Sequence, residues 1–333
     1  MLKLIFPKPN TVINTHTAIQ DEFIEKIHKI GTNSALEWLL PVKDDRERSH
    51  PQEITLKWEN DGSAVYTILL SEEKDVKTGI EYKTDKCEKT VTNLKINQKY
   101  YVFINDEFAG DFTTADNKYR FINIDGIMNV RDVGGIAIKQ GLLYRGADIS
   151  GEYTISKKGI EVFCNELKIK TELNLRMERH EDREFSVVGN GVRYKYLPYR
   201  PYAEIFKAEN RNYIRDIFDF LADKNNYPIY FHCLGGADRT GMIALYLRAL
   251  MGESDEDILT DFELTSLSTY ALGLSEGVPA RGFRNRNDEY FTEFLKLLAP
   301  YSDTPTLSAK VRAFLLDCGI EEETLDKVIE ILS

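Results

Sequence analysis

The sequence predicts a large α/β domain preceded by a small all-β sandwich. Residues 49–115 contain short runs of alternating apolar and polar residues separated by turn residues, a pattern typical of a β-sandwich. Residues 116–333 combine short buried-strand runs with segments whose apolar residues recur at helical spacing, which is typical of an α/β fold. We therefore expect three parts: an N-terminal segment of unknown role (1–48), the sandwich (49–115) and the α/β domain (116–333).

The composition is that of an ordinary soluble protein. The chain has 333 residues, 42% hydrophobic and 29% charged, enough for two domains and a sizeable core. Its net charge of −11 argues against binding to nucleic acid or to anionic membranes. No apolar run is long enough to span a bilayer. We therefore expect no nucleic-acid partner and no integral membrane association.

Cysteine usage points to neither a disulfide framework nor a zinc site. The four cysteines are far apart and form no C-x-x-C pair: Cys87, Cys164, Cys233 and Cys318. The first nine residues hold too short an apolar run for a signal peptide. We expect a cytoplasmic location, unless a signal peptide has been removed from the sequence.

The N-terminal segment contains one recognisable helix. Asp21 can start this helix and Gly31 can end it. The apolar residues between them fall on one helical face: Phe23, Ile24, Ile27 and Ile30. Nothing else in the segment indicates its role.

The sandwich region begins with a half-buried strand in which Ile54, Leu56 and Trp58 alternate with polar residues. Further strands are predicted at 65–70, around 91 and 94, at 100–104, and around 112. The run Leu94–Tyr100, with Trp58 upstream, resembles a fibronectin type III-like domain. This resemblance implies that the tyrosine forms a corner and that the tryptophan fills the core. The sequence does not indicate the partner of this domain.

The α/β domain opens on two Gly-containing motifs, at 129–135 and 141–146, followed by a helix at 155–167 and a buried strand at 171–175. Ser254 and Asp257 predict a helix cap. Apolar stripes predict four further helices around residues 214–221, 291–298, 311–315 and 325–332.

Residues 227–241 give a strand, a tight loop and a helix in that order, and the rest of the domain is organised around them. Ile229–Phe231 is the strand, and apolar residues at helical spacing follow Thr240. The backbone N–H groups of such a loop converge at the helix start, where the dipole adds positive character. Gly235 and Gly236 let the backbone curl around this point. The sequence thus predicts an anion-binding site.

A thiol and an arginine stand at the two ends of this loop. Arg239 can bind two phosphate oxygens at once, and the positive field favours the thiolate form of Cys233. Thr240 is placed to donate a hydrogen bond to the sulfur, and His232 can brace the loop. The alternative is a structural cysteine in a glycine-rich turn.

The string His232–Gly241 resembles the H-C-x-x-G-x-D-R-T-G loop of bacterial cysteine-dependent tyrosine/lipid phosphatases, and the motifs at 129–135 and 141–146 resemble the opening of the same group. The resemblance implies a protein-tyrosine-phosphatase-like, mostly parallel sheet flanked by helices. It also implies phosphomonoester hydrolysis through a phosphocysteine intermediate, with no metal or other cofactor. The implied catalytic residues are Cys233, Arg239, Asp238, Thr240 and His232. The implied phosphate-binding loop residues are Leu234, Gly235, Gly236 and Ala237.

The leaving oxygen needs a proton, and the resemblance implies Asp238 as its source. The alternative is that Asp238 caps the following helix. Asp132 and Asp148 are further candidates, although turn or cap roles suit them better. The group often has Asp-Leu-Arg where this chain has Asn174-Leu175-Arg176, and an asparagine cannot act as the acid.

Substrate preference is expected to depend on Ala237 and on several arginines. Relatives that act on phosphoinositides often have lysine at the position of Ala237, so its absence favours a simple monoester such as phosphotyrosine. Arg284 and Arg286, with Arg281, lie in a Gly-rich stretch where relatives insert a segment over the pocket, and we predict that they contact substrate; a solvated loop is equally compatible. Arg131 and Arg145, near the opening motifs, are predicted to bind substrate or to form structural ion pairs.

Three functions remain open from the sequence. The first is a protein-tyrosine or dual-specificity phosphatase, whose partner is a phosphorylated protein or a small phosphoester. The second is the same chemistry on a phosphoinositide or inositol polyphosphate. The third is an inactive module that binds phosphopeptides, which the intact loop residues disfavour.

Overall fold

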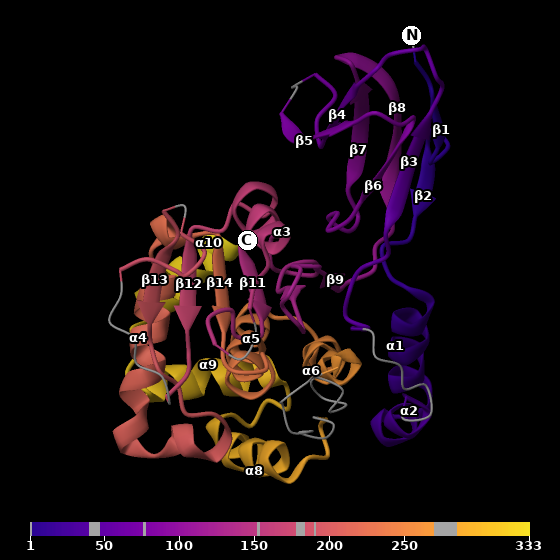
Figure 1. Ribbon diagram of the computed structural model, residues 1–333. Coiled ribbons are helices and arrows are strands. Elements are labelled where there is room, and N and C mark those ends of the chain that lie inside the picture. The colour runs from indigo at the N-terminus through magenta and orange to yellow at the C-terminus, as the bar shows by residue number, and fades with distance from the viewer. Residues whose placement is uncertain are drawn as a thin grey trace. The chain divides into compact units, whose positions relative to one another are not determined.

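The computed structural model describes residues 2–39, 47–75, 78–151, 154–177, 184–189, 191–269 and 285–333 (Figure 1). The chain forms two compact units. Unit 1 comprises Met1–Thr17 and Pro51–Ile122, and unit 2 comprises Ala18–His50 and Asn123–Ser333. The division therefore differs from the one expected from the sequence, because the segment 1–48 contributes to both units.

Unit 1 consists of two sheets that enclose one apolar core. The first sheet has the antiparallel order β1-β3-β6 (Leu4–Phe6, Ile54–Trp58 and Glu88–Val91). The second has the order β2-β8-β7-β4-β5 (Thr11–Ile13, Glu107–Thr114, Lys99–Ile104, Tyr66–Ser71 and Gly79–Thr84), in which only β2 and β8 are parallel. The strands predicted in this region are observed, although β6 ends at Val91, before Leu94. Strands β1 and β2 are too short to show alternation, and β5 has no fully buried residue.

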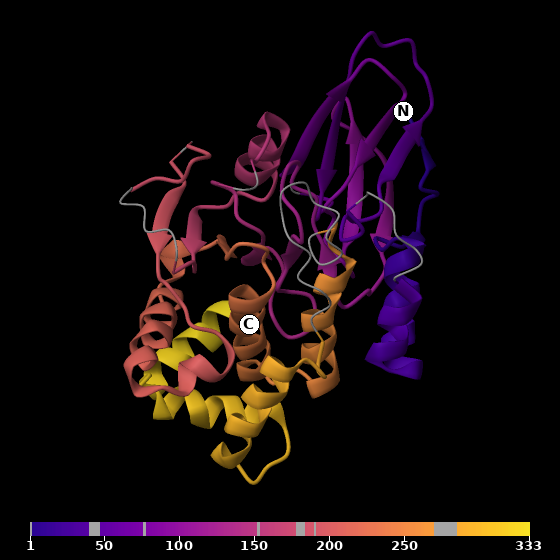
Figure 2. The same ribbon diagram turned by 60° about the horizontal axis from the view of Figure 1, so that its bottom comes forward.

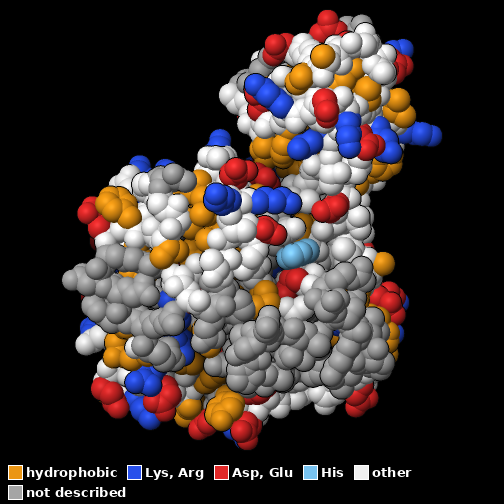
Figure 3. All heavy atoms as spheres, viewed as in Figure 1, with side chains coloured by type: hydrophobic (Ala, Val, Ile, Leu, Met, Phe, Trp, Pro, Cys, Tyr) orange, Lys and Arg blue, Asp and Glu red, His pale blue; other side chains and the backbone are white. Residues whose placement is uncertain are grey.

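Two aromatic residues of unit 1 occupy the positions that the sequence predicted. The Lys95 N–H donates to the Tyr100 hydroxyl at 2.8 Å, which ties β7 to the turn before it. Trp58 is buried and packs edge-on against Tyr66, with ring centroids 5.5 Å apart. Basic and acidic side chains are interspersed on the surface of unit 1, as Figure 3 shows for one face. Lys57 and Glu88 form one ion pair on this surface.

A helical hairpin from the N-terminal segment belongs to unit 2. It consists of α1 (Ala18–Ile30) and α2 (Thr32–Leu39), and Gly31, with φ of +85°, ends α1 as predicted. The Thr32 hydroxyl donates to Glu263 of α6 (Asp255–Glu263) at 2.7 Å. The predicted cap of α6 is also confirmed, because the Ser254 side chain accepts from the Asp257 N–H at 3.1 Å.

Unit 2 contains a mostly parallel sheet, so the predicted fold class is confirmed. Its strands lie in the order β13-β12-β14-β11-β10 (Arg193–Tyr196, Thr171–Asn174, Ile229–His232, Leu143–Gly146 and Arg131–Asp132). The first four are parallel and β10 is antiparallel to β11. The short strand β9 (Arg120–Phe121) precedes them along the chain. Ligand sites in parallel sheets lie at the carboxyl ends of the strands, and the predicted loop follows that end of the central strand β14.

Side chains of β14 alternate between the two faces of the sheet. Ile229 and Phe231 join the main apolar core, whose helices gather on one side of the strands (Figure 2). These helices are α4 (Arg211–Leu221), α5 (Asp238–Leu250), α8 (Glu289–Leu298), α9 (Leu307–Asp317) and α10 (Glu322–Leu332). On the other face Tyr230 contacts Phe163, at 5.4 Å between ring centroids. Phe163 lies in a π-helical turn (Val162–Glu166) that continues α3 (Lys157–Glu161).

Short 3-10 helices complete unit 2: Tyr202–Phe206, Ala208–Asn210, Lys224–Asn226, Leu264–Leu267 and Ala299–Tyr301. In the described parts of the chain, no helix has both the length and the apolar character needed to cross a membrane.

Candidate active site

The loop between β14 and α5 holds a buried thiol at the start of a helix. Cys233 follows the last residue of β14 and is only 4% exposed, and α5 begins at Asp238. His232 pairs with Gly146 of β11 on one side and with Asn174 of β12 on the other. The thiol therefore lies in the middle of the carboxyl edge of the sheet.

Three consecutive carbonyl groups of the loop accept hydrogen bonds from outside it. The donors are the Asp148 N–H to Leu234 (2.9 Å), Asn129 Nδ2 to Gly235 (3.0 Å) and Arg145 Nη2 to Gly236 (3.0 Å). In a trans peptide the carbonyl and the N–H of the same plane point in opposite directions. The N–H groups of residues 235–237 therefore point toward the inner side of the loop, where they can bind an anion.

Gly236 cannot be replaced by a larger residue without disturbing this arrangement. Its φ of +67° is one that residues with a side chain rarely adopt. A Cβ at this position would also lie 2.5 Å from the carbonyl group of Gly146. The loop is thus packed directly against the end of β11.

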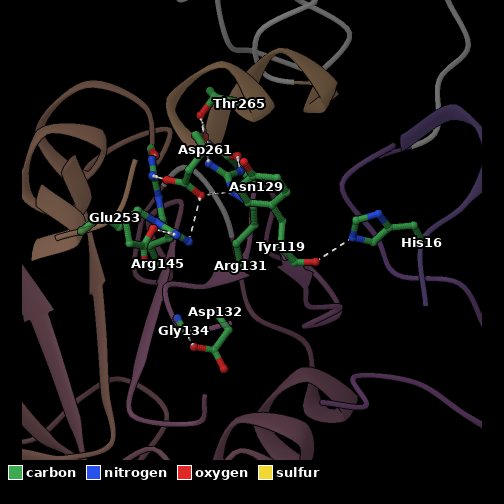
Figure 4. A network of polar contacts seen from close by, with 12 residues as sticks. His16, Tyr119, Asn129, Arg131, Asp132, Gly134, Arg145, Glu253, Asp261 and Thr265 are labelled. Atoms are coloured by element: carbon green, nitrogen blue, oxygen red, sulfur yellow. Dashed lines mark hydrogen bonds and ion pairs between the residues drawn. The ribbon is translucent and has the colours of Figure 1, made fainter. Parts of the chain in front are cut away.

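Beneath the loop, one buried carboxylate faces three guanidinium groups (Figure 4). The Asp261 carboxylate lies 2.5 Å from Arg145 Nη1, 3.3 Å from Arg131 Nε and 3.7 Å from Arg248 Nη2. Burial alone would raise the pKa of Asp261, but the three positive charges hold it well below its usual range. Arg248 is further paired with Glu253 at 2.6 Å.

Arg131 and Arg145 were predicted as substrate-binding residues, and the structure corrects this. Both side chains are completely buried below the loop, because they pair with Asp261 there. This corresponds to the ion-pair alternative. Arg145 orients the loop through the Gly236 carbonyl, and Arg131 does so indirectly, since its Nη1 donates to Asn129 Oδ1 at 2.6 Å.

His232 lies behind the loop. Its ring is fully buried, with Nδ1 3.1 Å from the Cys233 carbonyl and Nε2 3.1 Å from Glu172 Oε1. Glu172 is on the adjoining strand β12, on the same face of the sheet. This geometry matches the bracing role that the sequence predicted for His232.

Asp238 is the first residue of α5 and is 7% exposed. The predicted alternative, a helix cap, is not what the structure shows, because Ala237 occupies the cap position and no side chain bonds there. Instead Asp238 Oδ1 accepts a hydrogen bond of 2.7 Å from the Tyr202 hydroxyl. Arg239 follows at the loop exit and is half-buried.

Thr240 does not make the predicted hydrogen bond to the sulfur. Its hydroxyl is buried and has no hydrogen-bond partner among the described residues. Chain order places Thr240 in the first turn of α5, but it does not fix the side-chain rotamer that the bond requires.

The other acid candidates hold the backbone in place. The Asp132 carboxylate accepts from the N–H groups of Gly134 (2.8 Å) and Gly141 (2.7 Å). Asp148 is buried and lies 2.5 Å from Arg176 Nη1. Asn174 Oδ1 accepts from Arg176 Nε at 3.0 Å, so the asparagine orients this arginine toward Asp148. The turn role predicted for Asp132 is thus the observed one.

Of the three arginines predicted to contact substrate from the Gly-rich stretch, Arg286 is described, and Arg281 and Arg284 lie outside the described residues. The Arg286 guanidinium binds two carboxylates of α6, Glu263 at 2.9 Å and Glu256 at 3.0 Å. The structure therefore pairs Arg286 with protein carboxylates.

Sequence reasoning missed Tyr202, Glu172 and Asp261. No local pattern marks these residues, since the tertiary fold alone brings Tyr202 to Asp238, Glu172 to His232, and Asp261 to the arginine that holds Gly236. Asn129 was different, because it opens the motif at 129–135 and could have been assigned a role in the loop.

Tyr202, whose hydroxyl bonds to Asp238, also lines a cavity of about 670 Å³. Its walls carry two cationic and two acidic side chains, together with aromatic and aliphatic ones: Arg200, Lys207, Glu204, Glu293, Tyr202, Tyr290, Phe206 and Leu297. Lys207 and Glu204 pair with each other at 2.6 Å.

The fold and the loop together define a cysteine-based phosphatase. Residues 122–327 match the tyrosine phosphatase family, and the chain belongs to this family. Among solved structures it is similar to the core catalytic domain of the PP-IP phosphatase SIW14 from S. cerevisiae (16% identity, TM-score 0.30, covering 39% of this chain and 76% of that one). A second structure of the Siw14 catalytic core gives 15% identity and a TM-score of 0.29, with 44% and 86% covered. No curated protein matches the chain.

We expect Gly236→Ala to lower kcat/KM for a phosphomonoester by about 10²-fold, since small displacements of binding groups cost that much. The reason is the close approach of the loop to Gly146. Steady-state kinetics would be compared with Gly252→Ala, whose φ is +75° but where an added Cβ meets nothing within 4 Å. That control should keep its kcat/KM. Equal losses in both variants would mean that backbone strain alone, rather than the close approach to Gly146, explains the need for glycine at position 236.

Proposed function

We propose that the protein hydrolyses phosphomonoesters through a phosphocysteine intermediate and that its preferred substrate is phosphotyrosine in proteins, with dual specificity as an extension. One observation carries the proposal: a buried thiol begins a loop whose N–H groups are turned inward at a helix N-terminus. This arrangement suits a nucleophile that attacks a bound dianion.

In the proposed reaction the Cys233 thiolate attacks phosphorus in line with the leaving oxygen. The loop N–H groups and the Arg239 guanidinium stabilise charge on the three nonbridging oxygens. Asp238 donates a proton to the leaving oxygen as its bond to phosphorus breaks. Water then attacks the phosphocysteine and gives a proton to the Asp238 carboxylate, so inorganic phosphate leaves and the thiolate is restored.

Two features favour a single phosphate on an aromatic or peptide substrate. Ala237 is buried and supplies no cation beside the bound phosphate. The cavity next to Tyr202 carries balanced charges and several apolar side chains, among them Tyr290 and Leu297. A phosphoinositide or inositol polyphosphate would require a surplus of positive charge at this place.

A substrate panel tests this choice. We expect kcat/KM to be highest for phosphotyrosine peptides, lower for phosphoserine peptides, and lowest for phosphoinositides and inositol hexakisphosphate. The enzyme would be assayed in reductant with p-nitrophenyl phosphate as the common reference. A preference for the lipid or inositol substrates would establish the second function, and binding of phosphopeptides without any turnover would establish the third.

We further infer that unit 2 is a phosphatase domain of the bacterial tyrosine/lipid phosphatase group and that unit 1 is a fibronectin type III-like domain. The Tyr100 corner and the buried Trp58 support the second assignment. A cytoplasmic location is supported by the four free cysteines and by the need to protect a thiolate from oxidation.

A further inference from the structure

Tyr202 has a backbone conformation that its sequence context does not explain. Its φ is +57°, in the left-handed region that bulky residues seldom adopt. It follows Pro201 directly and begins the 3-10 helix Tyr202–Phe206. Residues held in such conformations persist only where the surroundings enforce them, and they gather at functional sites.

The surroundings fix the Tyr202 side chain from two directions. Its ring lies against Tyr290 of α8, with centroids 6.1 Å apart. Ile205, one turn later, is completely buried in the core and anchors the segment. The hydroxyl end of the ring donates to Asp238 Oδ1 at 2.7 Å. The unusual φ thus aims a phenol at the proposed acid.

We propose that Tyr202 is a positioning residue that holds Asp238 in the orientation needed for proton transfer. Its O–H occupies Oδ1, so the transferable proton is carried by Oδ2. With one oxygen fixed, the carboxyl plane can turn very little, and Oδ2 keeps a constant direction relative to the loop. This inference rests on the proposed function, because it assigns a role only if Asp238 protonates the leaving oxygen.

The test uses the dependence on the leaving group. A phenol or alkoxide leaving group needs the proton, whereas p-nitrophenolate is stable as an anion and needs it less. We expect Tyr202→Phe to lower kcat/KM for a phosphotyrosine peptide by about tenfold, the scale of one hydrogen bond to a charged group. For p-nitrophenyl phosphate the loss should be under about twofold. The ratio of the two kcat/KM values does not depend on the fraction of folded enzyme.

A double-mutant cycle and a matched control complete the experiment. In the Asp238→Asn background, Tyr202→Phe should have no further effect on either substrate. Tyr199→Phe removes a buried phenol nearby, one that bonds to the Tyr246 hydroxyl at 2.9 Å, and it should leave the substrate ratio unchanged.

Two results would overturn the inference: an unchanged ratio in Tyr202→Phe, whether or not both kcat/KM values fall, or an additive loss in the double variant. These results differ from failure of the proposed function. In that case the wild-type enzyme would turn over neither substrate, or Cys233→Ser would keep its turnover, and both proposals would fall together.

Discussion

Cys233→Ser is expected to abolish turnover while leaving substrate binding intact. A serine hydroxyl is a poor nucleophile at neutral pH unless a base activates it. His232, the adjacent imidazole, is turned behind the loop toward Glu172 and the Cys233 carbonyl. We therefore expect kcat to fall on the order of 10⁴-fold or more, as for loss of a nucleophile in other enzymes. The Kd for a phosphotyrosine peptide should change little, because the loop N–H groups and Arg239 remain.

Two measurements check this expectation. Steady-state kinetics and peptide binding would be compared with Cys164→Ser, which replaces a half-buried cysteine outside the loop and should behave as wild type. Mass spectrometry of wild-type enzyme quenched during turnover should detect a phosphate on the peptide that contains Cys233. Substantial turnover by Cys233→Ser, or a phosphate on another residue, would rule out the thiol mechanism.

The sequence was most informative where the functional residues are contiguous. The strand, the glycine-containing loop and the helix start all lie within residues 227–241, so their order alone indicated an anion site. The fold class was equally accessible, because the core stripes of α4, α8, α9 and α10 are regular. The hydrogen-bond partners of the loop atoms could not be predicted, since these residues come from other parts of the chain.

The supports of the loop are an example of what sequence cannot provide. Asn129, Arg145 and Asp148 each hold a different loop carbonyl, yet they lie 86 to 106 residues before the carbonyls that they hold. Asp261, which binds two of the buried arginines, lies on a helix with an ordinary amphipathic pattern. Arg131 and Arg145 could be recognised as motif residues, but only the burial of their side chains in the structure distinguishes support of the loop from contact with substrate.

The division between the units was also hidden from the sequence. Strands β1 and β2 are three residues long, and a period of two cannot be recognised over so few positions. The helix between Asp21 and Gly31 was recognisable, but its attachment to α6 depends on single contacts such as that of His28 with Thr260. Local pattern thus identifies elements more readily than it identifies the core that each element joins.

Asp261→Asn is expected to destabilise unit 2 by about 3–5 kcal/mol, the usual cost of breaking a buried ion pair. The change leaves Arg131, Arg145 and Arg248 buried with less compensating charge, since the Glu253 carboxylate is already shared between Arg248 and the Ala137 N–H. The free energy of unfolding would be followed by helical ellipticity in urea, because the helices of the described chain lie in unit 2. Glu256→Gln on the same helix breaks a half-exposed pair with Arg286 and should cost about 0–1 kcal/mol.

The pH dependence of this loss gives a second check. The pKa of Asp261 is lowered in the folded protein, so its stabilisation is present above the unfolded pKa of about 3.9 and disappears as pH falls through the folded value. The difference in unfolding free energy between wild type and Asp261→Asn should therefore be the same at pH 8 and at pH 5. A difference that shrinks over this range would mean that the carboxylate is already protonated there.

The same variant connects the buried charges to catalysis. Without Asp261, Arg145 loses the partner that holds its guanidinium, and its hydrogen bond to the Gly236 carbonyl should weaken. The peptide plane between Gly236 and Ala237 would then be free to turn, taking one N–H group away from the bound phosphate. We expect kcat/KM to fall by about 10²-fold even under conditions where the variant is fully folded, as for loss of one oxyanion donor. A folded Asp261→Asn enzyme with wild-type kcat/KM would mean that the loop keeps its conformation through Asn129 and Asp148 alone.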